Sequence, residues 1–200
     1  MAETPRPLTL PGDQAQPLNP EEAAAWEEVT DKLTNLAQRL KRGEPVSDED
    51  LRLPDLDQDR VLNALHVPAE AGAYAEDLER ILRRIPDGWG RWIGCQKGWW
   101  PLIIRLDRRL SSPDLDPLYR VEQVKEKLGG LRFYIQTSSP HAAAMEALID
   151  EAEAESETIC EVCGATGVLM VDDSNGGWLK TLCSGCAHGT GYRRVRPGEA

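Results

Sequence analysis

The residues best suited to chemistry in this sequence are four cysteines in two pairs near the C-terminus. Residues 164–182 separate the two C-x-x-C pairs, which lies within the range typical of structural zinc sites. A C-x-x-C turn directs both thiolates toward one centre, and two such turns complete the tetrahedron that Zn²⁺ requires. The spacing therefore predicts one zinc ion held by Cys160, Cys163, Cys183 and Cys186.

Two disulfides or a redox C-x-x-C site are the alternatives for these cysteines. We expect neither, because the N-terminus MAETPRPLTL lacks the features of a secretory signal and no β-α-β pattern surrounds either pair. Four thiolates leave no coordination position for water or substrate, which predicts a structural rather than a catalytic zinc. We interpret His188 as an exposed loop residue and the fifth cysteine, Cys95, as a buried one.

Outside the cysteines, the sequence shows no recognisable catalytic set. His66, His141 and His188 are dispersed along the chain, and no Ser–His–Asp set, phosphate-binding loop or H-E-x-x-H motif is present. The carboxylate-rich stretches are most simply interpreted as solvated helix faces. We therefore expect a protein that is not an enzyme.

A hairpin must bring the two cysteine pairs together. Residues 168–171 (VLMV) and 178–182 (WLKTL) are typical of strands, and the polar residues 172–177 between them are typical of a turn. Apolar residues at helical spacing predict a helix over 142–156, which leads into the first pair. Residues 159–200 are therefore predicted to form a zinc-binding module, of zinc-ribbon or treble-clef-like type, with a basic tail.

Residues 87–158 are predicted to form the rest of a small domain. Its glycine-rich beginning holds four tryptophans, either core residues or a groove for a partner, at Trp89, Trp92, Trp99 and Trp100. A helix is expected from Pro101 to Leu110, with its charged residues, including Asp107, directed outward. The run YRVEQVKEKLGGLRFYIQ predicts a β-hairpin turning at Gly129–Gly130, because both central residues of a type I′ turn need positive φ.

The N-terminal part of the chain is predicted to be helical and acidic. Residues 1–18 contain four prolines and little apolar periodicity, which predicts a disordered tail. Residues 19–86 contain three helical patterns, the first of which begins at Asn19 with Pro20 at its first helical position. The overall fold class is therefore α+β: a helical N-terminal region and a small hairpin-containing domain that carries the zinc module.

The charge of the chain is concentrated in two blocks. The formal net charge is −11; residues 1–60 and residues 141–163 each contribute −7, whereas residues 99–140 contribute +2. Acid of this density repels phosphate, so a basic protein is a more suitable partner than a nucleic acid. The acids on the outer face of the helix at 142–156 and just after it are candidates for binding such a partner: Glu146, Asp150, Glu153 and Glu157.

Basic residues on the hairpin favour a different partner. A sheet that carries bases beside an aromatic residue, next to a zinc ribbon, is one form of a nucleic-acid surface. The residues concerned are Arg120, Lys125, Lys127 and Arg132, close to Tyr134. A charged, exposed hairpin face without a ligand explains the same pattern.

Four segments resemble a family of small uncharacterised bacterial and phage-associated proteins. They are GWWPLIIRLDRRL, QVKEKLGGLRFYIQ, CEVCGATG and WLKTLCSGC, within about residues 87–187. In that family a K-E-K-x-G-G-L-R-F-Y hairpin precedes a helix and a four-cysteine ribbon. The resemblance implies the architecture and the zinc, and it implies no activity.

These observations lead to two main functional hypotheses. The first is a non-enzymatic, cytoplasmic zinc-binding protein that acts by protein–protein interaction, for example an inhibitor, immunity or anti-defence protein against a basic partner. The second is a zinc-ribbon regulator associated with DNA or RNA. A thiol redox protein is a third possibility. No apolar run reaches the length of about 18 residues that a membrane helix needs, so we expect no membrane partner.

Overall fold

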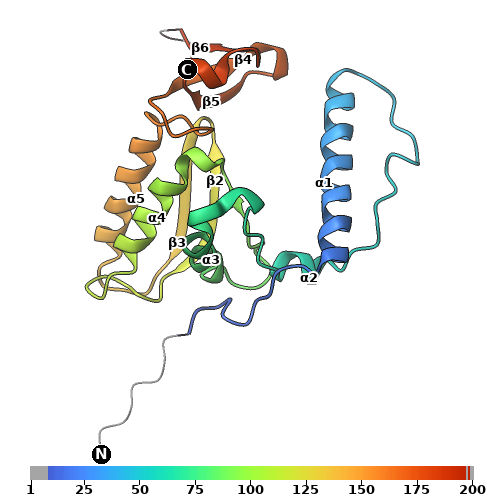
Figure 1. The fold of residues 1–200 in the computed structure, drawn as a ribbon. Coiled ribbons are helices and arrows are strands. Elements are labelled where there is room, and N and C mark those ends of the chain that lie inside the picture. The colour runs from blue at the N-terminus through green and yellow to red at the C-terminus, as the bar shows by residue number, and fades with distance from the viewer. Residues whose placement is uncertain (1–8, 197, 199–200) are drawn as a thin grey trace, which may run out of the picture.

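The computed structural model describes residues 9–196 and residue 198, and it has the predicted α+β fold (Figure 1). The helices are α1 (Pro20–Lys41), α2 (Gln58–Asn63), α3 (Ala75–Arg83), α4 (Trp100–Leu110), α5 (Ala142–Ser156) and α6 (Ser184–Ala187). The strands are β1 (Ile93–Gly94), β2 (Arg120–Lys127), β3 (Gly130–Gln136), β4 (Val168–Asp172), β5 (Trp178–Leu182) and β6 (Tyr192–Arg194). Short 3-10 turns cover Ala69–Tyr74, Lys97–Trp99 and Asp173–Asn175. Among the described residues, no helix is long and apolar enough to cross a membrane.

Two small sheets organise the chain from residue 87 onward. In the first, β1 pairs in parallel with β2, and β2 pairs with β3 as an antiparallel hairpin. Helices α3, α4 and α5 bury their apolar faces together with the inward side chains of this hairpin in one hydrophobic core. In the second sheet β4 lies between β5 and β6, and its small core is shared with the cysteine cluster. The sequence analysis did not predict the short strands β1 and β6.

The hairpin turn differs from the prediction by one residue. Leu128 and Gly129 occupy its two central positions, with φ of 56° and 82°, while Gly130 already belongs to β3 and pairs with Lys127. A leucine in the left-handed region carries a steric cost that a glycine does not, and the Leu128 side chain is 67% exposed. The tip of the hairpin therefore presents an apolar side chain on a strained backbone.

Asp107 on α4 is buried, whereas the sequence analysis expected it to face outward. Its Oδ1 accepts hydrogen bonds from Arg84 Nε at 2.7 Å and from the Tyr119 hydroxyl at 2.7 Å, and its Oδ2 accepts one from Arg80 Nε at 2.9 Å. A buried carboxylate requires such partners, and α3 and the segment before β2 supply them. Burial, followed by the adjacent Asp107 charge, raises the pKa of Tyr119 well above its ordinary value.

Part of the predicted disordered tail is bound to the rest of the molecule. Residues 1–8 lie outside the described residues, but the backbone N–H of Gly12 donates to Arg83 O at 2.7 Å. The Arg83 guanidinium in turn donates to the carbonyls of Gly12 at 2.8 Å and Asp13 at 3.0 Å. Residues 12 and 13 therefore have hydrogen-bond partners on α3 that proline content cannot reveal.

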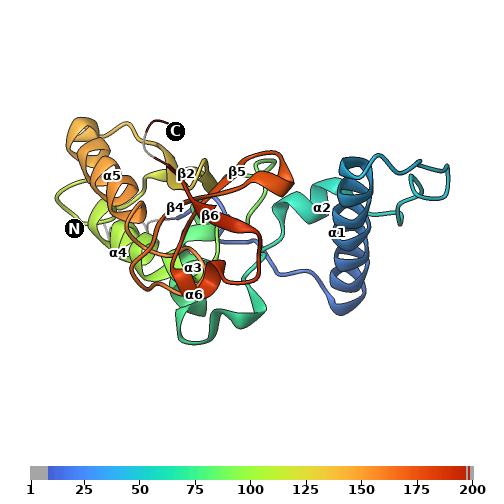
Figure 2. The same ribbon diagram turned by 90° about the horizontal axis from the view of Figure 1, so that it is seen from above.

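Helix α1 and the loop of residues 43–57 form an arm beside the core (Figures 1 and 2). The helix begins as predicted: Asn19 Oδ1 accepts from Glu22 N at 2.9 Å, and the Glu22 carboxylate accepts from Asn19 N at 2.8 Å. Trp26 connects the arm to the core, since its ring stacks on Trp92 at a centroid distance of 6.4 Å and contacts His66 at 5.8 Å. The arm also carries several exposed leucines.

Candidate metal centre

The structure brings the four predicted cysteines together at one point. The Sγ atoms of Cys160, Cys163, Cys183 and Cys186 all lie within 4.8 Å of one another. The first pair lies in the turn between α5 and β4, and the second lies at the end of β5 and in α6. The cluster is therefore positioned to bind one metal ion with four sulfur ligands.

The backbone around the first pair forms a tight turn that directs both sulfurs to the centre. Cys160 N donates to Ala165 O at 2.7 Å, and Gly164 N donates to Cys160 O at 2.8 Å. Gly164 has a φ of 79°, in the left-handed region, where a side chain would be strained. The residue that follows the C-x-x-C pair is therefore glycine for a conformational reason.

The electrostatics of the cluster favour a bound cation. A hydrogen bond from Cys186 N to Cys183 Sγ, at 3.4 Å, is the first cause that lowers the pKa of the Cys183 thiol to about 7. The hydrogen bonds that Cys186 makes with Cys163 and Cys183 raise its own pKa to about 12. Without a cation, ionising one thiol opposes ionisation of its neighbours, and a bound metal ion removes that conflict.

The turn that carries the first pair docks on the Trp-rich segment through Gly98. Gly98 N donates to Glu161 O at 2.7 Å, and Trp99 Nε1 donates to Ile159 O at 2.8 Å. A Cβ atom at Gly98 would overlap Cys160 O and would lie 2.5 Å from Glu161 O. The segment and the metal-binding turn are therefore in direct backbone contact, which only glycine permits.

Glu161, between the first two cysteines, is the central residue of this contact. Its side chain is buried, its Oε2 pairs with Lys180 Nζ at 2.7 Å, and its Oε1 accepts from Gln96 N at 3.2 Å. The sequence analysis did not identify Gly98, Glu161 or Lys180. The glycine-rich run was a signal for close packing, but nothing in it indicated that the contact would be the metal-binding turn.

The hairpin turn forms a second contact with the metal-binding module. Thr181 Oγ1 on β5 donates to Gly129 O at 2.6 Å, and a Cβ atom at Gly129 would overlap the Leu169 side chain. Gly129 therefore meets two demands, a positive φ and close approach to β4. The two hairpins of the molecule are thus fixed against each other.

The four tryptophans predicted as a possible binding cluster do not form one surface. Trp99 and Trp100 are 0% and 2% exposed and belong to the main core. Trp92 is half-buried against Trp26 of the arm. Trp89 is 56% exposed. The core interpretation therefore holds for Trp99 and Trp100, and Trp89 is the one of the four with most of its ring accessible.

The acidic helix α5 is partly neutralised by arginines of its own chain. Glu151 pairs with Arg109 at 2.8 Å and Glu155 with Arg105 at 2.6 Å, both from α4. Glu153, a predicted partner-binding residue, instead accepts from Phe133 N at 3.1 Å and so covers the open edge of β3. The other three predicted acids, Glu146, Asp150 and Glu157, are exposed and form no ion pair within the described part of the chain.

The four basic residues proposed for nucleic acid lie on β2 and β3 but differ in their surroundings. Arg132 pairs with Glu153 at 3.3 Å. Lys125 Nζ lies 5.6 Å from the centroid of the Tyr134 ring. Arg120 and Lys127 are exposed at the two ends of β2. The structure therefore places all four on one hairpin and leaves three of them unpaired with an acid within residues 9–196.

Cys95 and His188 lie apart from the four-sulfur cluster. Cys95 is only partly buried against the main core, and desolvation there, followed by the Glu161 charge, raises the pKa of its thiol to about 12. His188 follows α6 and is exposed, as predicted. Neither belongs to the group of cysteines that could hold the ion.

Comparisons with known proteins identify no family for this chain. No family model, no curated protein and no solved structure matches it.

Proposed function

We propose that this chain is a non-enzymatic binding protein, stapled by one structural zinc ion, whose acidic surface recognises a basic protein. An inhibitor, an immunity protein or an anti-defence protein would act in this way. The arm of α1 and residues 43–57 is the observation that carries the proposal.

Zinc suits the four-cysteine cluster for two reasons. Four thiolates are soft ligands, and a tetrahedral S₄ set is typical of zinc or iron–sulfur sites. Two C-x-x-C turns with a closed ligand set are typical of a structural zinc, which contributes to folding and leaves no position for catalysis. Cys160, Cys163, Cys183 and Cys186 would hold the ion.

Native mass spectrometry tests the zinc assignment directly. The wild-type chain should carry about 65 Da of bound metal, and Cys160→Ser should lose it because a closed site needs all four ligands. Cys95→Ser is the matched control and should retain the ion, since Cys95 lies outside the cluster. A wild-type protein of apo mass, or metal retained by Cys160→Ser, would contradict the assignment.

The arm has the properties of a surface for a basic partner. Its exposed apolar side chains include Leu33, Leu40, Leu51 and Leu53, which are 46%, 56%, 62% and 45% exposed. A hollow of about 500 Å³ lies between α1 and residues 53–62, lined by apolar residues such as Trp26 and with Asp55 in its wall. Exposed apolar patches with a polar rim are typical of interaction sites.

Charge determines the kind of partner that this surface suits. Residues 1–60 carry a net charge of −7, and on α1 the acids Glu27, Glu28 and Asp31 are exposed. Clustered charge of one sign attracts an oppositely charged protein and raises its association rate. The exposed acids of α5 extend the negative surface on the core. A basic protein with an apolar contact patch therefore fits the arm best.

Affinity capture from the native host with charge-reversed baits tests this function. The full zinc-loaded chain is used as bait in nuclease-treated extract, beside a variant with Glu27, Glu28 and Asp31 replaced by Lys. A basic protein should be captured by the wild type, should elute as salt rises, and should be lost from the variant. A matched control replaces Glu70 and Glu76, on the core side of the chain, and should retain the protein. Capture that survives reversal of the arm would contradict the proposal.

A further inference from the structure

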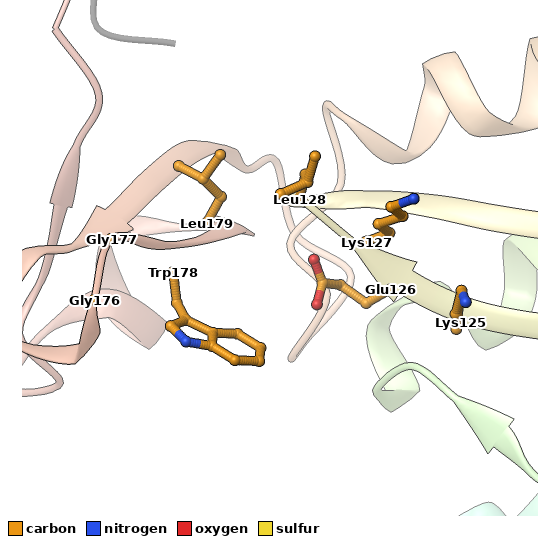
Figure 3. A pocket seen from close by; sticks show the side chains of 8 residues that line it. All are labelled: Lys125, Glu126, Lys127, Leu128, Gly176, Gly177, Trp178 and Leu179. Carbon is orange, nitrogen blue, oxygen red and sulfur yellow. The ribbon is translucent and has the colours of Figure 1, made fainter. Parts of the chain in front are cut away.

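A hollow lies between the two hairpins and shares no residue with the four-cysteine cluster or the arm. It has a volume of about 460 Å³ and lies between the β2–β3 turn and the β4–β5 turn (Figure 3). Its walls are Lys125, Glu126, Lys127, Leu128, Gly176, Gly177, Trp178 and Leu179. We call it the inter-hairpin hollow. The volume is in the range of ligand-binding pockets.

The side chains of the hollow combine a half-exposed aromatic ring with positive charge. The indole of Trp178 is 53% exposed and stands on one wall, while Glu126, Lys127 and Lys125 lie along the other (Figure 3). Within the described residues, neither Lys125 nor Lys127 forms an ion pair, whereas Lys180 on β5 is neutralised by Glu161. Gly176 and Gly177 leave the floor beside the indole without side chains.

Glu126 adds a hydrogen-bond acceptor of defined position. Its Oε1 accepts from Gly129 N at 2.6 Å, which fixes the side chain across the hairpin turn. Its second carboxylate oxygen accepts no hydrogen bond from the described residues, and the side chain lines the hollow (Figure 3). A carboxylate in this position accepts from an amino group, such as the exocyclic amine of cytosine or adenine.

We propose that the inter-hairpin hollow binds single-stranded nucleic acid, with an amino-bearing base stacked on Trp178, its amine at Glu126, and the flanking phosphates at Lys125 and Lys127. Stacking on an exposed aromatic ring together with lysine–phosphate contacts is the general mode of single-strand binding. A duplex cannot use this mode, because its bases are stacked on each other. One wall of the hollow belongs to residues 99–140, which carry a net charge of +2, and neither wall belongs to the acidic arm.

This inference does not depend on the proposed protein partner. The arm and the inter-hairpin hollow share no residue, so each can be changed by substitutions that leave the residues of the other in place. The chain's net charge of −11 limits the affinity, because phosphate is repelled by the acidic blocks at low salt. We therefore expect moderate binding by a short segment of about one to three nucleotides at the hollow.

Fluorescence anisotropy with labelled oligonucleotides tests the proposal. The zinc-loaded full chain is titrated into single strands of about ten nucleotides, oligo-dC and oligo-dT, at about 50 mM salt. Oligo-dC should bind about tenfold more tightly than oligo-dT, because thymine has no exocyclic amine for Glu126. Trp178→Ala should weaken oligo-dC binding by about tenfold or more.

Matched variants separate the hollow from other surfaces. Trp89→Ala removes an equally exposed indole outside the hollow and should leave binding unchanged. Lys125→Ala with Lys127→Ala should flatten the salt dependence, whereas Lys97→Ala, at an exposed site outside the hollow, should not.

Glu126→Gln tests the contact with the base. Glutamine keeps an oxygen for Gly129 N and presents an amide N–H₂, which donates to thymine O4. The variant should therefore lose the preference for oligo-dC over oligo-dT while remaining folded.

Any one of the following results would overturn the inference: no binding at low salt, equal effects of the Trp178 and Trp89 variants, a duplex binding as tightly as the single strand, or displacement of the oligonucleotide by an acidic peptide at equal charge. The last result would assign the hollow to an acidic protein. Displacement of the oligonucleotide by free CMP at an equal concentration of phosphate groups would also overturn the inference. It would show that a single nucleotide binds the hollow as well as a strand does, without contacts to flanking phosphates.

Discussion

Replacing Gly98 with alanine should separate the metal-binding turn from the core. A Cβ atom at this position would overlap Cys160 O and would lie 2.5 Å from Glu161 O and 2.6 Å from Gly164 N. All three are backbone atoms of the turn that holds the first cysteine pair, so no side chain can rotate away to make room. To reach an ordinary contact of about 3.4 Å, the turn must withdraw by roughly 1 Å.

The size of the effect follows from the contacts that this withdrawal breaks. It lengthens the hydrogen bonds from Gly98 N to Glu161 O (2.7 Å) and from Trp99 Nε1 to Ile159 O (2.8 Å). Each is worth about 1 kcal/mol net, and overpacking costs about 1–3 kcal/mol. The lower entropy of the unfolded chain with alanine offsets about 0.4–1 kcal/mol. We expect the free energy of unfolding to fall by about 2–4 kcal/mol.

Urea unfolding of the metal-loaded protein measures this change. The comparison requires that the free energy of unfolding falls with urea concentration at the same slope in each variant. Gly185→Ala is the matched control in the same module. Its Cβ atom would meet only Cys183 Sγ at 3.9 Å, and Gly185 is not among the glycines with positive φ. This control should be as stable as the wild type or more stable by up to about 1 kcal/mol. If Gly98→Ala matched Gly185→Ala, the metal-binding turn would not be docked on the core in the way described.

Three further changes test other parts of the structure. Asp107→Asn should lower the free energy of unfolding by about 3 kcal/mol, because it leaves the buried Arg84 guanidinium without a countercharge. Thermal unfolding measures this loss, and a value below about 1 kcal/mol would contradict the buried hydrogen-bond network of Asp107. After chelation of the metal, four thiols should react with a thiol reagent at pH 8. Cys95, whose pKa is raised to about 12, should react only after unfolding. A fifth thiol that reacts as fast as these four would contradict the raised pKa of Cys95. Trp99→Phe should cost about 1 kcal/mol or more through the lost Nε1 hydrogen bond, whereas Trp89→Phe at its exposed site should cost little, and equal losses in urea unfolding would contradict the core assignment.

Patterns that repeat within a few residues predicted the local elements well. The strands of the second sheet, residues 168–171 and 178–182, match β4 and β5 to within one residue, and the helix at 142–156 matches α5. The cysteine spacing predicted the metal cluster for the same reason, since two C-x-x-C turns already contain the geometry of the site.

Contacts between distant segments could not be predicted in this way. Asp107 is a charged residue at a helical position that looks exposed, and its partners Arg84 and Tyr119 lie 23 and 12 residues away. Gly98 lies in a glycine-rich run whose composition indicates close packing, but the residues it contacts, within 160–164, are far away in the sequence. A short strand such as β6 contains too few residues to show an alternating pattern and is stabilised by its pairing with β4.

Strand β5 connects the four-cysteine cluster to the inter-hairpin hollow. Within its five residues this strand carries Trp178 in the wall of the hollow, Lys180 in the ion pair with Glu161, and Thr181 in the hydrogen bond to the hairpin turn. Cys183 follows directly, so a metal ion bound by the four cysteines would fix the end of the same strand. A hairpin of two short strands is marginally stable by itself, and a closed metal site can supply the missing stability. A metal ion held by the four cysteines would therefore stabilise the strand that carries Trp178, although no cysteine of the cluster lines the hollow.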